Sequence, residues 1–540
     1  MKNEETLKTR RSILEIQRAH EAGDVKPLEN LMRAWRGVKA LDSDDPRSFF
    51  MLGGFHGEPF RGPGVDDSAY WGGYCMHGNV LFPTWHRIYL YKLEQALQSI
   101  PGCEEVMLPY WDETDEYSLN NGIPSCLTDE KFKLDGAYID NPLRSFTFPV
   151  KISDQILDNG NPSAYSKPKG YETVRFPLSG LVSTPEEVAK TELYNKQFSD
   201  SERLYYLNHN VVSWLSDRGS NPRRPLQNVH DLYKMCLTAP NYTVFSNTTS
   251  YAKYNMDNPT NLVQPLEQPH NDVHISVGGP NRTVTPPVIY ASGDMGDNET
   301  AGLDPIFYFH HCNVDRVFWL WQKQNGFTEH LEIIANYPGT KSSDAQGPTP
   351  GYSMDSELNL SSPLYPFAKN GELLYPYNEN DPSDVYTSMD CINIEKQLNL
   401  TYSLGSLEKP VSTLTKEKMT EPIHINANNS RKQLFVTDIS KGDISGSFII
   451  AAYITLDGTR ELLGYHSVLS RKNVRGCANC LTHLDVAASF KLNNYTEEEV
   501  KRATFDVEIR AKEADNEAVL KKFSAAGLKS DVPPYKLEVR

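Results

Sequence analysis

Apolar residues recur with helical spacing at several places in the first 325 residues. Residues 27–41 carry Leu, Met, Trp and Val at this spacing, and the proline at their start suits the first turn of a helix. A long helix is predicted from Trp85, and a shorter one over 199–215. Further helices are predicted near Glu267 and after Asp304-Pro305, where an N-cap residue precedes a first-turn proline. The pattern predicts a mainly helical N-terminal region.

The last part of the chain changes to an alternation of period two. Residues 447–456 and 460–469 are apolar and flank Asp457-Gly458, which is typical of a hairpin with a two-residue turn. Residues 503–510 and 535–539 alternate in the same way. This region therefore predicts an all-β, sandwich-like domain.

Two less regular segments help to place the domain boundaries. Between 112 and 254 the chain is rich in Pro, Gly, Asn and Ser, so an extended loop-bearing insert with short helices is expected. A closing strand is expected near residue 400, and a polar, lysine-bearing stretch follows it. We predict a catalytic domain over 1–405, a linker over 406–430 and a C-terminal β domain over 431–540.

Composition narrows the functional class. The formal net charge of −16 over 540 residues disfavours nucleic acid and anionic membranes as partners. No run of 18 apolar residues occurs, and the charged N-terminus lacks a signal-peptide core. Eight cysteines are too few for a disulfide scaffold in a chain of this length. We expect a cytoplasmic protein.

Histidines gather in two widely separated groups. The first comprises His56, His77 and His86, and the second comprises His270, His274 and the adjacent pair His310 and His311. The histidines at 270 and 274 share one helical face. His311 falls on the apolar stripe of its predicted helix, whereas His310 falls beside Asn313 on a more polar line. The stripe favours His311 as the inward ligand.

Nitrogen-only ligand groups in pairs point to copper. Imidazole suits zinc, copper, iron or nickel, so the number and grouping of the histidines must decide. A catalytic zinc site usually has three protein ligands, often with a carboxylate, and neither group here is led by His-Glu-x-x-His. A single histidine is more often a hydrogen-bonded core residue than a ligand. Six in apolar helical settings predict two copper ions that cycle between Cu(I) and Cu(II) with oxygen between them.

Two motifs resemble the signatures of the type-3 copper family, which comprises tyrosinases, catechol oxidases and molluscan-type haemocyanins. They are Phe82-Pro-Thr-Trp-His-Arg87 and Asp304-Pro-Ile-Phe-Tyr-Phe-His-His-Cys-Asn-Val-Asp-Arg316. The chain as a whole is most similar to fungal intracellular pro-tyrosinases, which are latent polyphenol oxidases. The resemblance implies a four-helix bundle that holds two copper ions, with O₂ as co-substrate. It assigns His56, His77 and His86 to copper A and His270, His274 and His311 to copper B, with His310 as an alternative or a neighbour behind the ligands.

The same resemblance implies three further residue roles near the copper ions. Cys75, two residues before His77, would form a thioether bond with that ring; the plain alternative is a small buried hydrophobe. Glu267 and Asn271 would hold the water that helps a phenol lose its proton. For Glu267 the alternative is a first-turn carboxylate favoured by the helix dipole.

Cys477-Ala-Asn-Cys480 is an isolated Cys-x-x-Cys in the predicted β domain. By itself it could be half a zinc site, a redox pair or a coincidence. Soft thiolates favour Cu(I), and the resemblance implies that Cys477 and Cys480 deliver copper. It also implies that the β domain covers the copper site with a residue of the 465–469 loop, until a protease cuts the 406–430 linker.

The resemblance thus predicts a latent tyrosinase that hydroxylates phenols and oxidises catechols to o-quinones, in the family's usual role of melanin formation. Catechol oxidase and o-aminophenol oxidase are alternatives with the same site, and a haemocyanin-like oxygen carrier is a third. Expected partners are small phenols and catechols and an activating protease. A homo-oligomer is compatible with the sequence.

Overall fold

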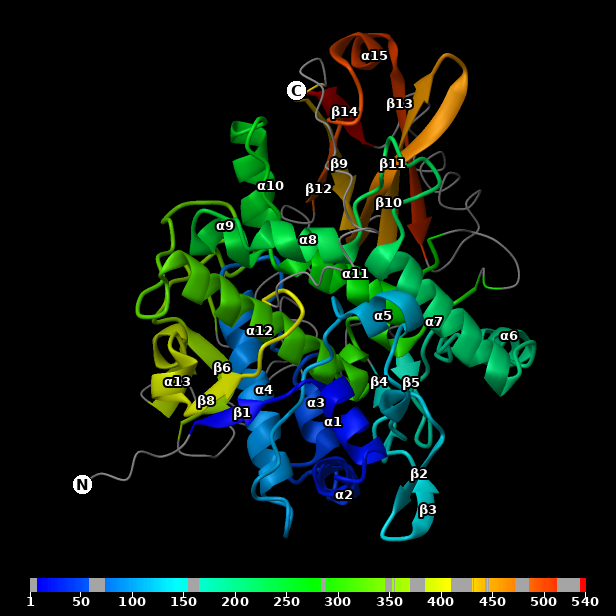
Figure 1. Cartoon of the computed structure of the whole chain (residues 1–540), viewed down its shortest axis with the longest axis vertical. Coiled ribbons are helices and arrows are strands. Elements are labelled where there is room, and N and C mark those ends of the chain that lie inside the picture. Colours follow the sequence, from blue (N-terminus) through cyan, green and yellow to red (C-terminus); the bar gives the residue numbers. More distant parts are fainter. Residues whose placement is uncertain are drawn as a thin grey trace.

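Helices are the main regular structure in the first 330 residues of the computed structural model (Figure 1). The structure describes residues 7–57, 73–153, 165–282, 288, 290–344, 352–353, 355–369, 384–408, 430, 432–441, 444, 446–471, 485–511 and 535–540. The helices are α1 (Ile13–Glu21), α2 (Lys26–Ala40), α3 (Phe49–Gly54), α4 (Phe82–Gln98), α5 (Glu116–Asn121), α6 (Pro185–Asn195), α7 (Asp200–Ser216), α8 (Val229–Cys236), α9 (Tyr242–Ser246), α10 (Thr248–Asp257), α11 (Glu267–Gly278), α12 (Ile306–Asn325), α13 (Ile394–Gln397) and α15 (Glu497–Arg502).

The predicted helices are confirmed, with shifted ends. Helix α4 begins at Phe82 rather than Trp85, because Pro83 occupies its first turn. Before α12, an Asp304 carboxylate oxygen accepts from the Ile306 N–H at 3.2 Å, and the same carboxylate pairs with Arg175 at 2.7 Å. The segment expected to be mostly loop holds more helix than predicted, since α5 to α10 all fall within it or at its end.

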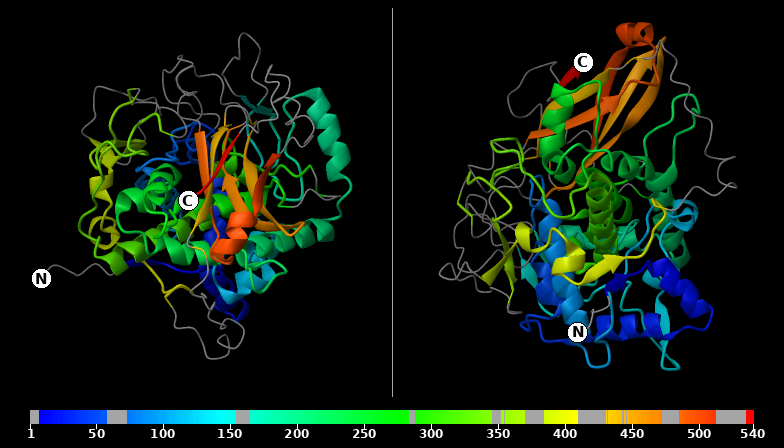
Figure 2. Two further views of the ribbon diagram at one scale, coloured as in Figure 1. Left: turned by 90° about the horizontal axis from the view of Figure 1, so that it is seen from above. Right: turned by 60° about the vertical axis from the view of Figure 1, so that its left-hand side comes forward.

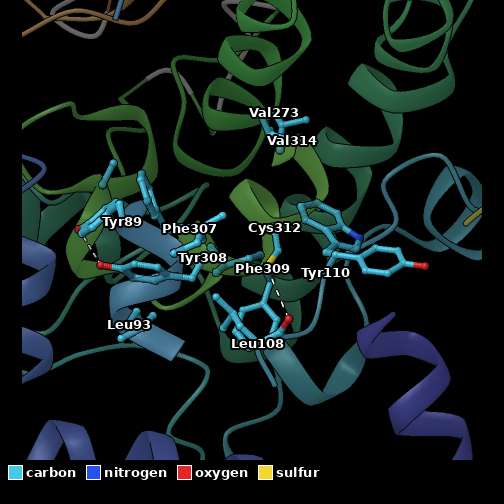
Figure 3. Packing of buried hydrophobic residues seen from close by; sticks show 14 of the residues in the cluster. Tyr89, Leu93, Leu108, Tyr110, Val273, Phe307, Tyr308, Phe309, Cys312 and Val314 are labelled. Atoms are coloured by element: carbon cyan, nitrogen blue, oxygen red, sulfur yellow. Dashed lines mark hydrogen bonds between the residues drawn. The ribbon is translucent and has the colours of Figure 1, made fainter. Parts of the chain in front are cut away.

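Helix α12 runs through the core of the helical domain. It is buried from Ile306 to Gln322 and packs against α4 and α11. Figure 3 shows Tyr89 of α4 and Tyr308 of α12 joined through their hydroxyl groups, which lie 2.7 Å apart. Cys312 lies in the same packing, with its thiol 3.5 Å from the Leu108 carbonyl oxygen. Burial raises the pKa of this thiol to about 12, which is consistent with a packing role.

Short strand pairs hold the helical domain together at its edges. They are β1 (Lys8–Arg10) with β8 (Leu400–Tyr402), β2 (Lys131–Leu134) with β3 (Ala137–Asp140), β4 (Ile152–Ser153) with β5 (Ser166–Lys167), and β6 (Pro363–Ala368) with β7 (Val385–Thr387). In the first pair, which is parallel, Lys8 lies opposite Leu400. The predicted closing strand therefore ties the end of the helical domain to its beginning.

The C-terminal region forms two three-stranded sheets with a hydrophobic core of their own. The strands are β9 (Gln433–Ser440), β10 (Phe448–Leu456), β11 (Thr459–Val468), β12 (Asp485–Lys491), β13 (Thr504–Ala511) and β14 (Lys536–Val539), in the orders β11-β10-β13 and β12-β9-β14. The predicted hairpin is confirmed, with Leu456 opposite Thr459 and positive φ angles of 51° at Asp457 and 81° at Gly458. The 465–469 segment, predicted as a loop, mostly belongs to β11.

The β sheets lie on one end of the helical domain, above α8 and α11 (Figures 1 and 2). Ile449 of β10 is part of the large core of the helical domain. Arg224 pairs with Glu461 and Glu499 across the boundary, at 2.7 Å each. In the part of the chain that the structure describes, no helix is both long and apolar enough to cross a bilayer.

Candidate metal centre and substrate cavity

The fold brings the two groups of histidines face to face. Possible ligand atoms of His56, His77 and His86 lie within 4.8 Å of one another, as do those of His270, His274, His310 and His311. The His86 and His311 rings are 4.6 Å apart, and the His77 and His270 rings are 5.6 Å apart. All seven side chains are buried.

Backbone carbonyls orient three of the rings. The Nδ1 atom lies 3.2 Å from the Asn298 oxygen in His56, 2.8 Å from the Phe82 oxygen in His86, and 2.7 Å from the Met295 oxygen in His274. A carbonyl only accepts, so each Nδ1 carries the proton and each Nε2 keeps its lone pair. This is the usual arrangement behind a metal-bound imidazole.

The inward nitrogens lack the partners that buried polar atoms normally have. Nε2 of His56 and His86 and both ring nitrogens of His77 are buried without a hydrogen bond among the described residues. Burial lowers the pKa of His86 to about 3, so its ring is neutral at neutral pH. Neutral, convergent and unsatisfied imidazoles fit a metal ion.

In the second group, three Nε2 atoms converge on one point. His311 Nε2 lies 3.2 Å from Nε2 of both His270 and His274. At a metal–nitrogen distance of about 2.0–2.1 Å, nitrogens so spaced subtend roughly 100° at the ion. His274 carries its proton on Nδ1, so its Nε2 has none. The contact between Nε2 of His274 and Nε2 of His311 is therefore a hydrogen bond only if His311 donates. A cation between the three rings satisfies all of them.

His310 is held by a buried carboxylate behind this group. Its Nδ1 lies 2.5 Å from Glu113 Oε1, while Glu113 Oε2 accepts from Tyr233 at 2.7 Å and Asn313 at 3.1 Å. The polar line predicted for His310 and Asn313 is thus the side of α12 that meets Glu113. Burial lowers the pKa of His310 to about 3 and raises the pKa of Glu113 well above its ordinary value, so both charged forms are disfavoured and the pair shares one proton in this hydrogen bond.

Cys75 is buried, and side chains from two segments that are distant in sequence contact it. Its sulfur accepts from Asn298 Nδ2 at 3.9 Å and from Arg471 Nη2 at 3.4 Å. Arg471 follows β11, so a side chain of the C-terminal domain reaches the segment that carries His77. Burial raises the pKa of the Cys75 thiol.

A cavity of about 230 Å³ lies beside the histidines, and Glu267, Asn271 and His77 line it. Asn271 Oδ1 lies 3.0 Å from Nδ1 of His270. Glu267 accepts from the Gly78 N–H at 2.7 Å, and from the Thr248 N–H and hydroxyl at 2.8 and 3.0 Å. Burial raises the pKa of Glu267 above its ordinary value. The predicted pair therefore lies together in one wall of the cavity.

The opposite wall comes from the C-terminal domain. It comprises Lys441, His466, Ser467, Val468, Leu469, Asp485, Val486 and Ala487. The Ser467 hydroxyl donates to Asp272 of α11. Tyr465 does not line this cavity; its ring lies 5.9 Å from the Trp214 ring and 4.3 Å from the Arg282 guanidinium. Within the 465–469 segment, the residues at the cavity are thus His466 to Leu469.

Several supporting groups gave no signal in the sequence. Glu113 and the carbonyls of Met295 and Asn298 lie far along the chain from the rings they orient, and no motif marks them. Cys477, Cys480 and residues 409–429 of the predicted linker lie outside the described residues. Residues 406–408 are bound to the helical domain, since the Ser406 N–H and hydroxyl donate to Asp112 at 2.7 Å.

Comparisons with known proteins agree with this geometry. The common central domain of tyrosinase matches residues 46–324. Tyrosinase HcTyr2 of Hahella sp. is 49% identical over 529 residues, which cover 93% of this chain and 92% of that protein. The tyrosinase of Aspergillus oryzae is 38% identical over 525 residues, which cover 92% of this chain and 91% of that protein.

Among solved structures, the tyrosinase from Burkholderia thailandensis at low pH matches with a TM-score of 0.84 and 49% identity, covering 99% of this chain and 100% of that one. Bacterial as well as fungal tyrosinases are therefore similar to this chain over almost its whole length. The chain belongs to the tyrosinase family, and it is a copper-dependent oxidoreductase whose two buried histidine groups fit two copper ions.

Proposed function

We propose that the chain is a latent tyrosinase: with O₂ it hydroxylates monophenols ortho to their oxygen, oxidises o-diphenols to o-quinones, and is shielded by its C-terminal domain. The observation that carries the proposal is the cavity in which Glu267 and Asn271 lie beside the histidines, beneath residues of β11.

His56, His77 and His86 would hold copper A, and His270, His274 and His311 would hold copper B. His311 is preferred over His310 because its Nε2 lies 3.2 Å from Nε2 of both His270 and His274. When bound, the copper pair supplies the O₂-dependent two-electron oxidation of the family. We also propose a thioether between Cys75 and His77, which would lock a ring that has no hydrogen bond among the described residues.

Glu267 and Asn271 are suited to remove the phenol proton. The Asn271 oxygen accepts from His270, so its Nδ2 group is left to donate into the cavity. Glu267 Oε1 accepts one N–H bond and retains one acceptor site. A water between the two would donate to Glu267 and keep a lone pair for the phenol proton. A phenol has an ordinary pKa of about 10, so such a base is needed for hydroxylation but not for catechol oxidation.

The C-terminal domain is positioned to restrict entry. Residues 466–469 and Lys441 form one wall of the substrate cavity, and Ser467 bonds to α11 between the copper-B histidines. We propose that cleavage in the 406–430 linker by a protease releases this domain. Copper delivery by Cys477 and Cys480 is part of the same proposal and rests on the resemblance alone.

Oxygen uptake with tyrosine and with DOPA tests the proposal, on copper-loaded protein before and after limited trypsin treatment. Activity on both substrates should rise after cleavage. The matched control replaces Lys416 and Lys418 by Gln, because these are the linker lysines that trypsin can cut; Lys409 is followed by Pro410. This change should strongly reduce the rise. Turnover of the catechol alone would identify a catechol oxidase, and preference for an o-aminophenol would identify that alternative.

The proton-accepting pair is tested separately with Asn271→Ala. Hydroxylation of tyrosine should fall by about 100-fold, the lower end of the range for general acid–base catalysis, while DOPA oxidation changes much less. Asn141→Ala is the control, because this buried asparagine bonds to the Cys126 and Asp129 carbonyls away from the cavity. An equal loss on both substrates in Asn271→Ala would contradict the assigned role.

A further inference from the structure

A second and larger cavity lies at the boundary between α7 and β11. Its volume is about 680 Å³, and it shares no lining residue with the cavity beside the histidines. Its walls include Phe176, Tyr205, Tyr206, Arg282, Tyr465 and Tyr495. Both domains contribute to it, since Tyr205 and Tyr206 belong to α7 and Tyr465 belongs to β11; Figure 1 shows α7 below the C-terminal strands.

Arg282 is a buried cation in the wall of this cavity. Its side chain is 6% exposed, and its guanidinium lies over the rings of Trp214 at 5.0 Å and Tyr465 at 4.3 Å. One N–H group donates to the Ser213 carbonyl. Among the described residues no carboxylate lies within ion-pair distance of it; the nearby carboxylates of Asp217 and Asp272 favour its charge from further away, and Tyr465 bonds to it. Burial outweighs these contacts and lowers the pKa of Arg282, so an anion in direct contact would stabilise its charged form.

The other arginines of the cavity are already paired. Arg224 binds Glu461 and Glu499 at 2.7 Å, and Arg460 pairs with Asp506 and, at 2.8 Å, with Glu508. Asp217 faces the cavity too; its carboxylate accepts from the Gly219 N–H at 2.8 Å and favours the charge of Arg282 from beyond ion-pair distance. Among the described residues, Arg282 is therefore the guanidinium of this cavity without a carboxylate in direct contact.

We propose that this cavity binds a small aromatic carboxylate, with the carboxylate on Arg282 and the ring among the tyrosines. A guanidinium matches a carboxylate in geometry and charge, and the cavity has the size of an ordinary small-molecule site. Because its walls come from both domains, the ligand stabilises the arrangement in which the C-terminal domain is docked. The site goes beyond the copper centre and does not depend on the reaction proposed above.

The probe is 3-phenylpropionate, which has no phenolic hydroxyl, and its uncharged match is 3-phenylpropanamide. Calorimetry on the copper-loaded full chain should show one site for the carboxylate and at least about tenfold weaker binding of the amide, as expected for a hydrogen bond to a charged group. Binding should be equal in copper-stripped protein, because the site lies away from the histidines. Equal affinity for the two probes would overturn the proposal, and so would loss of 3-phenylpropionate binding when copper is removed.

Variants locate the ligand. Arg282→Met should weaken 3-phenylpropionate binding at least about tenfold, whereas Arg460→Met, which changes an already paired guanidinium of the same cavity, should not. Tyr205→Ala gives a second test if Arg282→Met fails to fold, because Tyr205 is 62% exposed on α7 and its loss should weaken both probes. Unchanged binding in Tyr205→Ala and in any folded Arg282→Met protein would place the ligand elsewhere. The carboxylate should also slow tryptic release of the C-terminal domain in wild type but not in Arg282→Met.

Discussion

The two histidine groups differ in the backbone that carries them. His270 and His274 stand four residues apart on α11, and His311 stands on α12, which is buried over most of its length. In the other group, His86 lies on α4, but His56 follows the six-residue α3 and His77 lies in the non-helical residues before α4. One group rests on helices alone, and the other depends partly on loop backbone.

This difference shows where each group obtains its rigidity. Helix hydrogen bonds close within each turn, so the spacing of His270 and His274 needs no distant partner. His56 instead relies on the Asn298 carbonyl, and the segment of His77 relies on the bond from the Gly78 N–H to Glu267 and on Arg471 beside Cys75. The loops of the copper-A group should therefore depend more strongly than α11 on these distant contacts and on the metal itself.

The largest effect is expected from removing a helix-borne ligand. His311→Ala should reduce bound copper from two ions to about one and lower oxygen uptake by more than ~100-fold, since even residues behind the ligands cost 10- to 100-fold. Copper analysis and oxygen uptake measure both. His310→Gln should keep both ions, because Gln can still donate to Glu113; loss of copper in this variant but not in His311→Ala would reverse the assignment.

The next largest effect is expected from changing Glu113, whose carboxylate lies beside α12. Glu113→Gln should weaken copper B by roughly 10- to 100-fold, because Glu113 holds the His310 ring, which packs 5.3 Å from the His270 ring and 5.1 Å from the His311 ring. Copper A should stay in place, since Glu113 contacts no residue of the first group. Chelator titration that resolves the two ions would show this split. Tyr233→Phe removes one bond to the same carboxylate and should have a smaller effect; equal weakening of both ions would contradict the comparison.

A smaller loss, confined to copper A, is expected from Cys75→Ala. Without the proposed thioether the His77 ring is free to turn, so copper A should bind about tenfold more weakly. Intact mass provides an independent reading, because the wild-type chain should be lighter than its sequence by two hydrogen atoms. Cys312→Ala is the control. The Cys312 thiol packs against Leu108 and takes no part in the proposed thioether, so the mass difference should persist.

The smallest effect should accompany copper removal itself. Chelation should raise amide exchange in residues 73–81 by a few-fold more than in α11, because helical amides keep their internal hydrogen bonds while the loop loses its metal anchor. Hydrogen exchange with mass detection measures the contrast. A greater increase in α11 would show that the helices, not the loop, depend on the metal.

Much of the copper-B side could be predicted from local pattern. The four-residue spacing of His270 and His274 and the apolar stripe through His311 are properties of a single helix, and the structure has both helices. The Asp457-Gly458 hairpin was predictable for the same reason, since the turn needs only two adjacent residues that tolerate positive φ. The observed helix ends differ from the predicted ones by a few residues, because proline and cap contacts, and not the apolar periodicity, set where a helix begins.

What the sequence determined by itself is thus the type of element and the periodic side of it that bears each histidine, because helical and strand periods are local properties of the chain. The tertiary structure alone decided the pairing of His310 with Glu113, the carbonyls that orient His56 and His274, the placement of residues 466–469 over the cavity, and the stacking of Arg282 on Tyr465. Each of these joins segments that are distant in sequence and share no periodic signal, so only the packing of the whole chain brings them together.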